Sequence, residues 1–179
     1  MWYAEASRIY VLPFGKLPEA LLETLSEALE TTFQKENLVF ADAPLPLDAY
    51  SRERQQCNST AILAKTARMD FDGMALGVIE ADLFASALNF VFGEADPVEG
   101  MAVISLSRLK EEFYGREPEW KLLLSRAQKE ALHEVGHLYG LSHCQDRRCV
   151  MFFSDTLEET DNKSARFCPE CAAKKTPPE

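Results

Sequence analysis

The chain has 179 residues, of which 46% are hydrophobic and 27% are charged, values that fit one globular domain with a sizeable core. No apolar run approaches the ~18 residues of a membrane span. The formal net charge of −10 argues against non-specific nucleic-acid binding, which needs a basic surface. We therefore expect binding neither to nucleic acid nor to a membrane, and we also expect a monomer.

The spacing of apolar residues along the chain predicts five strands and three main helices. The expected order is a βαβαβ unit, two further strands and a last helix, which gives an α/β (α+β) fold with helices packed on a mixed sheet. Asn58 or Ser59 caps the second helix, and Pro118 opens the third. The predicted strands are 8–14, 38–41, 74–79, 88–92 and 101–106, and the predicted helices are 18–33, 59–69 and 118–139.

All three histidines of the chain fall within residues 133–143. His133 and His137 are four residues apart, so on a helix they share one face and can bind one Zn²⁺. Glu134 lies beside the first histidine and can reach a water on the same metal. Gly140 should end the helix, because glycine enters the left-handed conformation cheaply. The chain can then turn back, and His143 supplies a third nitrogen.

Three neutral nitrogen ligands leave the fourth zinc position open, which is typical of a catalytic zinc site. Zinc lowers the pKa of its bound water to about 7. Glu134 can then act as the general base and later pass the proton to the leaving amine. The pattern therefore predicts hydrolysis of peptide bonds without a covalent intermediate.

Two close cysteine pairs follow, Cys144 with Cys149 and Cys168 with Cys171. This spacing is typical of a four-thiolate zinc site, and two disulfides are the alternative. Disulfides need an oxidising compartment, whereas the first residues show no apolar segment of a secretory signal. We therefore favour a structural zinc and a cytoplasmic location. Cys57 has no evident partner and is expected to be a small buried hydrophobe.

The two predicted metal sites are adjacent in the sequence. His143 completes the first and Cys144 begins the second, so their Cα atoms lie about 3.8 Å apart. We expect the cysteine-bound zinc to order the third histidine. The predicted organisation is an N-terminal subdomain over residues 1–139, a C-terminal subdomain with little regular structure over 140–173, and a disordered tail over 174–179.

The long motif His-Glu-x-x-His-x-x-Gly-x-x-His, followed by Met151, resembles the metzincin zinc peptidases. The adjoining Cys-x4-Cys-x-Met and the later Cys-x-x-Cys are similar to the archaemetzincins among them. The resemblance implies a five-stranded twisted mixed sheet with three main helices, two Zn²⁺ per chain, and a peptide or protein substrate. It also implies that Met151 packs beneath the histidines without binding metal; an ordinary core methionine is the alternative. Metzincins place an antiparallel edge strand above the zinc. Residues 88–92 are the candidate for it, unless they form a simple buried strand.

Other functions fit part of the pattern. A non-catalytic zinc protein could bind peptides or partners, although the presence of Glu134 favours an enzyme. The four-cysteine unit could instead be an interaction module. The sequence does not distinguish an endopeptidase from an aminopeptidase. An aminopeptidase needs a carboxylate for the substrate α-amino group. Glu130, one turn before Glu134, is the candidate, with a solvated surface glutamate as the alternative.

Overall fold

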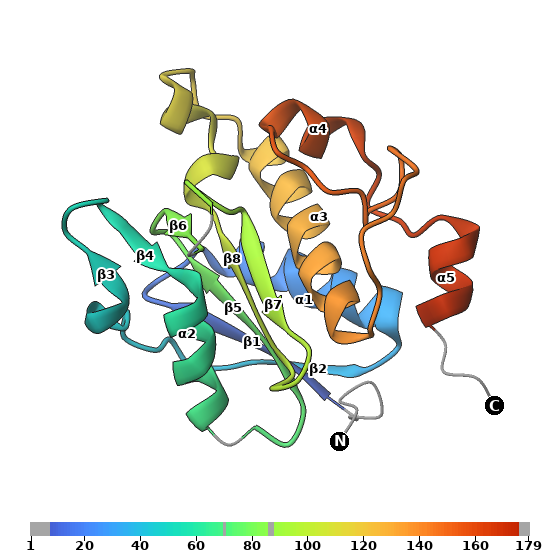
Figure 1. Ribbon diagram of the computed structural model, residues 1–179, viewed down its shortest axis with the longest axis horizontal. Coiled ribbons are helices and arrows are strands. Elements are labelled where there is room, and N and C mark those ends of the chain that lie inside the picture. Colours follow the sequence, from blue (N-terminus) through green and yellow to red (C-terminus); the bar gives the residue numbers. More distant parts are fainter. Residues whose placement is uncertain (1–7, 70, 86–87, 176–179) are drawn as a thin grey trace.

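The structure, a computed structural model, describes residues 8–69, 71–85 and 88–175. Its main sheet has the strand order β2-β1-β5-β8-β7 (Figure 1). β1, β2, β5 and β8 are parallel to one another, and β7 pairs antiparallel with β8. The predicted five-stranded mixed sheet is confirmed. The strands are β1 (Arg8–Phe14), β2 (Glu36–Val39), β5 (Met74–Ile79), β7 (Gly93–Asp96) and β8 (Met101–Ser105).

Helices cover both faces of this sheet (Figure 1). α1 and α3 pack against each other on one face, and α2 lies on the other face, against β7 and β8. The three predicted main helices are therefore confirmed. Their bounds are Glu19–Phe33 for α1, Ser59–Thr66 for α2 and Trp120–Leu138 for α3, and two short helices follow, α4 (Leu157–Asn162) and α5 (Pro169–Lys175).

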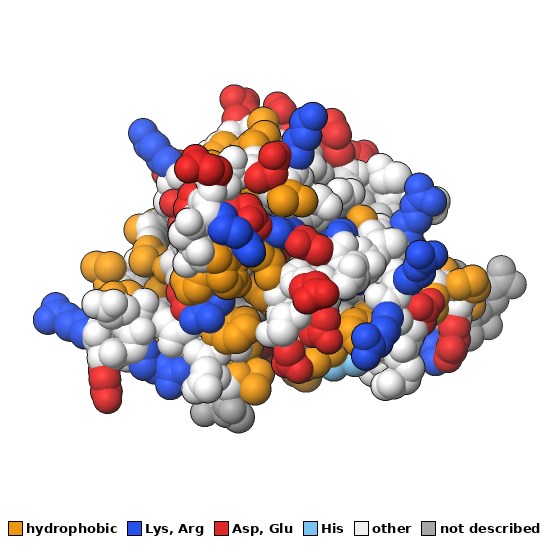
Figure 2. Space-filling view, turned by 90° about the horizontal axis from the view of Figure 1, so that it is seen from above, with side chains coloured by type: hydrophobic (Ala, Val, Ile, Leu, Met, Phe, Trp, Pro, Cys, Tyr) orange, Lys and Arg blue, Asp and Glu red, His pale blue; other side chains and the backbone are white. Residues whose placement is uncertain are grey.

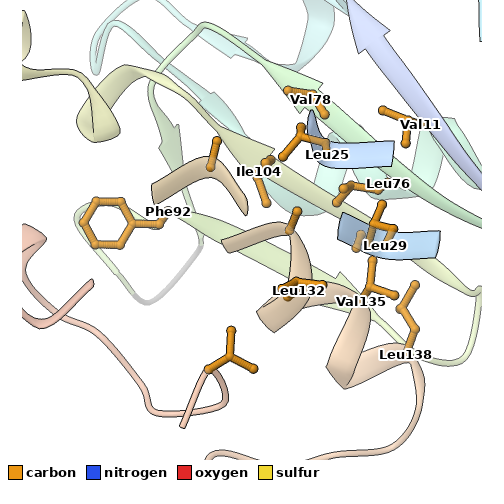
Figure 3. Packing of buried hydrophobic residues seen from close by; sticks show 14 of the residues in the cluster. Val11, Leu25, Leu29, Leu76, Val78, Phe92, Ile104, Leu132, Val135 and Leu138 are labelled. Carbon is orange, nitrogen blue, oxygen red and sulfur yellow. The ribbon is translucent and has the colours of Figure 1, made fainter. Parts of the chain in front are cut away.

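The alternation of side chains along the central strands produces this layered arrangement. In β1, Ile9 and Val11 point into the core shared with α1 and α3, whereas Tyr10 and Leu12 point into the core shared with α2. Each fully buried aliphatic side chain contributes about 1.5–3 kcal/mol. Figure 3 shows the side of α3 that carries Leu132 facing α1 and the sheet. This packing fixes the position of the helix that carries the histidines.

The segment 88–92 is not a strand of the main sheet, so that prediction is wrong. Gly93 begins the edge strand β7 instead of ending a strand. The sequence Gly-Glu-Ala-Asp of β7 has weak β-propensity, and its pairing with β8 makes it a strand. In the apolar run before it, Val91 makes an isolated bridge to Leu83, and the Phe92 carbonyl accepts a hydrogen bond from the Ser105 amide at 2.8 Å. The second strand, β2, begins at Glu36, two residues before the predicted start at Leu38.

A second, three-stranded sheet was not predicted. Strands of two or three residues are too short to give a sequence periodicity. The sheet leads directly into α2, whose N-cap is Asn58: its side chain accepts a hydrogen bond from the Ala61 amide at 2.8 Å. The added strands are β3 (Tyr50–Ser51), β4 (Gln56–Asn58) and β6 (Leu83–Phe84). Within the described residues, 3-10 turns span Leu47–Ala49, Ala67–Met69, Ser107–Leu109 and Glu111–Tyr114.

The part of the chain after Gly140 is more regular than expected, since it contains α4 and α5. Lys174 and Lys175 belong to α5, which corrects the prediction of a disordered tail at these two positions. The rest of that predicted tail, 176–179, lies outside the described residues. The subdomain boundary at residue 139 stays a prediction. Among the described helices, none combines the length and apolar character that crossing a bilayer requires.

Candidate active site

The C-terminal end of α3 brings the three histidines together. Gly140 has φ +77°, and its amide bonds the His137 carbonyl at 2.9 Å while the Leu141 amide bonds the Gly136 carbonyl at 3.2 Å. This pair of bonds is the Schellman ending of a helix, which needs the left-handed conformation that glycine supplies. The chain therefore reverses after Gly140. The ligand atoms of His133, His137 and His143 all lie within 4.8 Å of one another.

Backbone carbonyls orient two of the imidazoles. Nδ1 of His133 lies 2.8 Å from the Val150 oxygen, and Nδ1 of His137 lies 2.7 Å from the Leu141 oxygen. A carbonyl only accepts, so both Nδ1 atoms donate and both Nε2 atoms keep a free lone pair. Burial also lowers the pKa of His133, His137 and His143, which favours the neutral form that binds metal.

The spacing of these nitrogens fits zinc. In a tetrahedral site with Zn–N bonds of about 2.0–2.1 Å, two nitrogens lie about 3.3 Å apart. The Nε2 atoms of His133 and His137 are 3.2 Å apart. Together with Glu134, the three histidines line a cleft of about 690 Å³. In the space-filling view, a histidine side chain reaches the surface beside acidic side chains (Figure 2).

Glu134 lies in the same cleft as the three histidines. Its side chain lines the cleft, but the residue is only 5% exposed. Burial, and to a lesser extent the nearby Glu130 carboxylate, raises the pKa of Glu134 well above its ordinary value. A raised pKa makes a carboxylate a stronger proton acceptor near neutral pH.

β7 packs its backbone directly on this carboxylate. A Cβ atom added to Gly93 would lie 2.6 Å from both Cγ and Oε1 of Glu134, and 2.7 Å from the Val103 carbonyl oxygen. Real Cβ atoms essentially never come so close, and one of these contacts is with rigid backbone. Glycine at position 93 therefore allows the edge strand and the candidate base to lie side by side.

We predict that Gly93→Ala displaces Glu134 or β7 and lowers the free energy of unfolding by about 1–3 kcal/mol, as overpacking does. Denaturant unfolding measures this loss. Gly115→Ala is a control for the general effect of replacing glycine, because no atom lies within 4 Å of a Cβ there, although its positive φ adds some strain. Equal stability of the Gly93→Ala variant and the unmodified protein would contradict the described contact.

The four cysteine sulfurs form a second group within 4.8 Å of one another. Cys144 and Cys168 are 3.8 Å apart at Sγ, far beyond the ~2.05 Å of a disulfide. All five cysteines are free, so the disulfide alternative is wrong. Four sulfurs around zinc, with Zn–S about 2.3 Å, also lie about 3.8 Å apart. The Cys168 amide donates to the Cys149 sulfur at 3.3 Å, and the Cys171 amide donates to the Cys168 sulfur at 3.5 Å. The bond from Cys171 lowers the pKa of Cys168, which favours its thiolate form.

Met151 lies beneath the histidine-bearing turn of α3. It is fully buried, and a Cβ added to Gly136 would lie 2.5 Å from its sulfur. Its carbonyl accepts a bond from the Cys144 amide at 2.9 Å, so the segment after the cysteine pair also supports His143. Cys57 is fully buried against the other face of the sheet, as expected of a small hydrophobe.

Glu130 is not a solvated surface residue, so that alternative is wrong. It is 3% exposed, and its Oε1 lies 3.0 Å from Nζ of Lys163, whose side chain is fully buried. Glu130 also lines the cleft. Lys163 was missed at the sequence level, because the polar stretch that contains it gives no sign of burial.

The segment 88–92 does border the cleft, together with β7. Two arginines contact this segment. Arg54 donates to the Asn89 carbonyl at 3.0 Å, and the Arg108 guanidinium lies 4.1 Å from the centroid of the Phe90 ring. The predicted segment thus forms part of the cleft lining, although the strand that packs on Glu134 is β7.

The fold and the three-histidine site define the class of the protein as a zinc metallopeptidase. The pattern of Peptidase family M54 matches residues 48–176. An archaemetzincin of Pyrococcus furiosus is 43% identical over 174 residues, covering 93% of this chain and 91% of that protein. The chain belongs to this family, the archaemetzincins, and as a peptidase it acts on peptide or protein substrates.

Solved structures agree with this assignment. The archaemetzincin of Methanopyrus kandleri has a TM-score of 0.83 and 36% identity, and the match covers 94% of this chain and 92% of that chain. The archaemetzincin of Archaeoglobus fulgidus, solved with malonate, has a TM-score of 0.80 and 38% identity, covering 93% of this chain and 99% of that chain. The resemblance inferred from the motif is confirmed.

Proposed function

We propose that the chain hydrolyses peptide bonds with Glu134 as general base, beside a zinc held by His133, His137 and His143. The observation that supports this most strongly is the convergence of three neutral imidazoles and one buried carboxylate on the same cleft. Zinc bound there would polarise the scissile carbonyl and make water more acidic. The alternative function, a non-catalytic protein that binds peptides, does not require a buried carboxylate beside the histidines.

The protein's own groups have separate tasks in this mechanism. Glu134 accepts a proton from the attacking water and returns it to the leaving amine. The carbonyls of Val150 and Leu141 hold two histidines in the tautomer that presents Nε2. β7 lies at the end of the described sheet, so a substrate in extended conformation can pair with its backbone. This moves the proposed strand addition from residues 88–92 to Gly93–Asp96.

Glu130 does not suit the recognition of a substrate α-amino group. Such recognition needs a free anion beside the metal, whereas the Glu130 carboxylate already pairs with Lys163 and accepts a bond from Thr160. We infer that the substrate is held mainly by its backbone, which favours cleavage within a peptide over removal of its first residue.

The second proposed metal is a structural zinc on Cys144, Cys149, Cys168 and Cys171. We predict two zincs per chain, measured by mass spectrometry under native conditions. Brief treatment with a chelator should leave a folded species with one zinc and no hydrolytic activity, because the open histidine site releases metal sooner than four thiolates do. Added zinc should restore hydrolysis. A single metal per chain in the untreated protein would sink this proposal.

Acidification should empty the histidine site only below the ordinary imidazole range. Burial lowers the pKa of His133, His137 and His143 from the usual 6.5, so protons compete with metal at lower pH than they do for a free imidazole. In the metal-free protein, acidification has an effect in the same direction, on stability. Because the pKa values of these histidines are lowered on folding, the folded state binds fewer protons than the unfolded state, and the free energy of unfolding falls as pH drops below 6.5. Zinc release followed by an indicator dye against pH tests this. Half-release at or above pH 6.5 would contradict it.

A further inference from the structure

A buried ion pair that the proposed mechanism does not use lies behind the histidine site. The side chain of Lys163 is 0% exposed and that of Glu130 is 4% exposed, with Nζ 3.0 Å from Oε1. The hydroxyl of Thr160 donates to the same oxygen at 3.2 Å. A buried charge is tolerated when it is paired and hydrogen-bonded, and this pair meets both conditions. It joins α3 to the residue that follows α4.

Lys163 also reaches the segment that carries Met151. Three successive carbonyls of this segment each accept a bond. The Val150 oxygen accepts from Nδ1 of His133 at 2.8 Å, the Met151 oxygen from the Cys144 amide at 2.9 Å, and the Phe152 oxygen from Nζ of Lys163 at 3.5 Å. The segment is therefore connected to a zinc-binding histidine at one end and to the ion pair at the other.

The connection returns to the helix from which it started. Glu130 lies on α3, three residues before His133. The next residue along the segment, Phe153, places its ring centroid 4.8 Å from that of His143. Any shift of this segment away from α3 would move the acceptor of one histidine and the packing partner of another.

We propose that Glu130 and Lys163 are a positioning pair, which holds residues 150–153 against α3 so that the Val150 carbonyl orients His133 and the Phe153 ring packs on His143. The inference rests on the three-histidine metal site of the proposed function. Glu130 and Lys163 act on the site through this segment and take no part in the chemistry.

The alternative role, a tether for α4 alone, is already filled by other bonds. Arg126 makes two hydrogen bonds of 2.7 Å to the Asp161 carboxylate, and Nζ of Lys129 donates to the Thr160 and Asp161 carbonyls at 3.0 and 2.9 Å. These contacts hold α4 on α3 without touching residues 150–153. They provide a matched control.

The test uses the full chain with its cysteine site loaded and compares three proteins: the unmodified chain, Glu130→Gln/Lys163→Met, and Asp161→Asn. The double variant removes both charges together, so that no lone charge stays buried. The affinity of the histidine site for zinc is measured by competition with a coloured chelator, and its geometry by the absorption spectrum with Co²⁺. We expect the double variant to bind zinc at least about 10-fold more weakly, with a changed Co²⁺ spectrum. Asp161→Asn should match the unmodified chain.

Equal affinity and spectrum in the double variant would overturn the inference, and so would an equally large loss in Asp161→Asn. If the double variant does not fold, Glu130→Gln/Lys163→Gln replaces it, because this variant keeps polar groups on both sides of the contact. Its zinc affinity and Co²⁺ spectrum are then compared with those of the unmodified chain in the same way. Failure of the proposed function is a separate outcome, because the unmodified chain would then bind no zinc at its histidines.

Discussion

Glu134→Gln is expected to abolish hydrolysis while the fold and the zinc content stay unchanged. The amide has nearly the same shape as the carboxylate and fits the same buried space beside Gly93, but it cannot accept the proton of the attacking water. Loss of general acid–base catalysis lowers rates by about 10²–10⁴-fold.

The comparison needs a substrate that the unmodified protein cleaves, found with a peptide library. Glu158→Gln is the matched control, because it makes the same chemical change at an exposed position on α4. Zinc content and thermal unfolding of both variants show whether the fold is kept. If Glu134→Gln cleaves the peptide as fast as the unmodified protein, Glu134 is not the base.

The second large effect is expected from Cys168→Ser. Ligation of zinc by four thiolates contributes on the order of 10 kcal/mol to the folding of small zinc peptides. Loss of one thiolate should therefore remove the structural zinc and loosen the chain around Cys144. His143 is the adjacent residue, so zinc affinity at the histidine site should fall about 10-fold or more. The contacts between Arg126 and Asp161 should keep α4 on α3, which confines the damage to the cysteine-bearing loops.

Metal titration of the variant measures both sites. Cys57→Ser is the control, since it makes the same substitution in the core on the other side of the sheet. The control should keep two zincs, although a hydroxyl in the core costs stability. Unchanged zinc affinity at the histidines of Cys168→Ser would show that the structural zinc does not order the catalytic site.

The grouping of the histidines and of the cysteines could be predicted from the sequence because much of it is local. His133, His137 and Gly140 belong to one helix and its end, where spacing alone decides which side chains meet. The same holds for the layers of the fold, since Ile9 and Tyr10 sort to opposite faces by simple alternation. These features need no knowledge of distant residues.

The features that were missed depend on residues far apart in the chain. β7 is a strand because β8 pairs with it, although its own residues have weak β-propensity. The burial of Glu130 depends on Lys163, 33 residues later, and the polar sequence around each gives no sign of the other. Gly136, between His133 and His137, is a further signal for the expected packing of Met151, because a Cβ atom there would lie 2.5 Å from the Met151 sulfur.

The position of the metals tests the central claim most directly. Diffraction data from crystals of the purified protein, collected on both sides of the zinc absorption edge, locate each zinc by its anomalous signal. We predict two peaks per chain, one among the Nε2 atoms of His133, His137 and the ring of His143, and one among the four cysteine sulfurs. Absence of a peak at the histidines in a zinc-loaded, hydrolytically active protein would contradict the account.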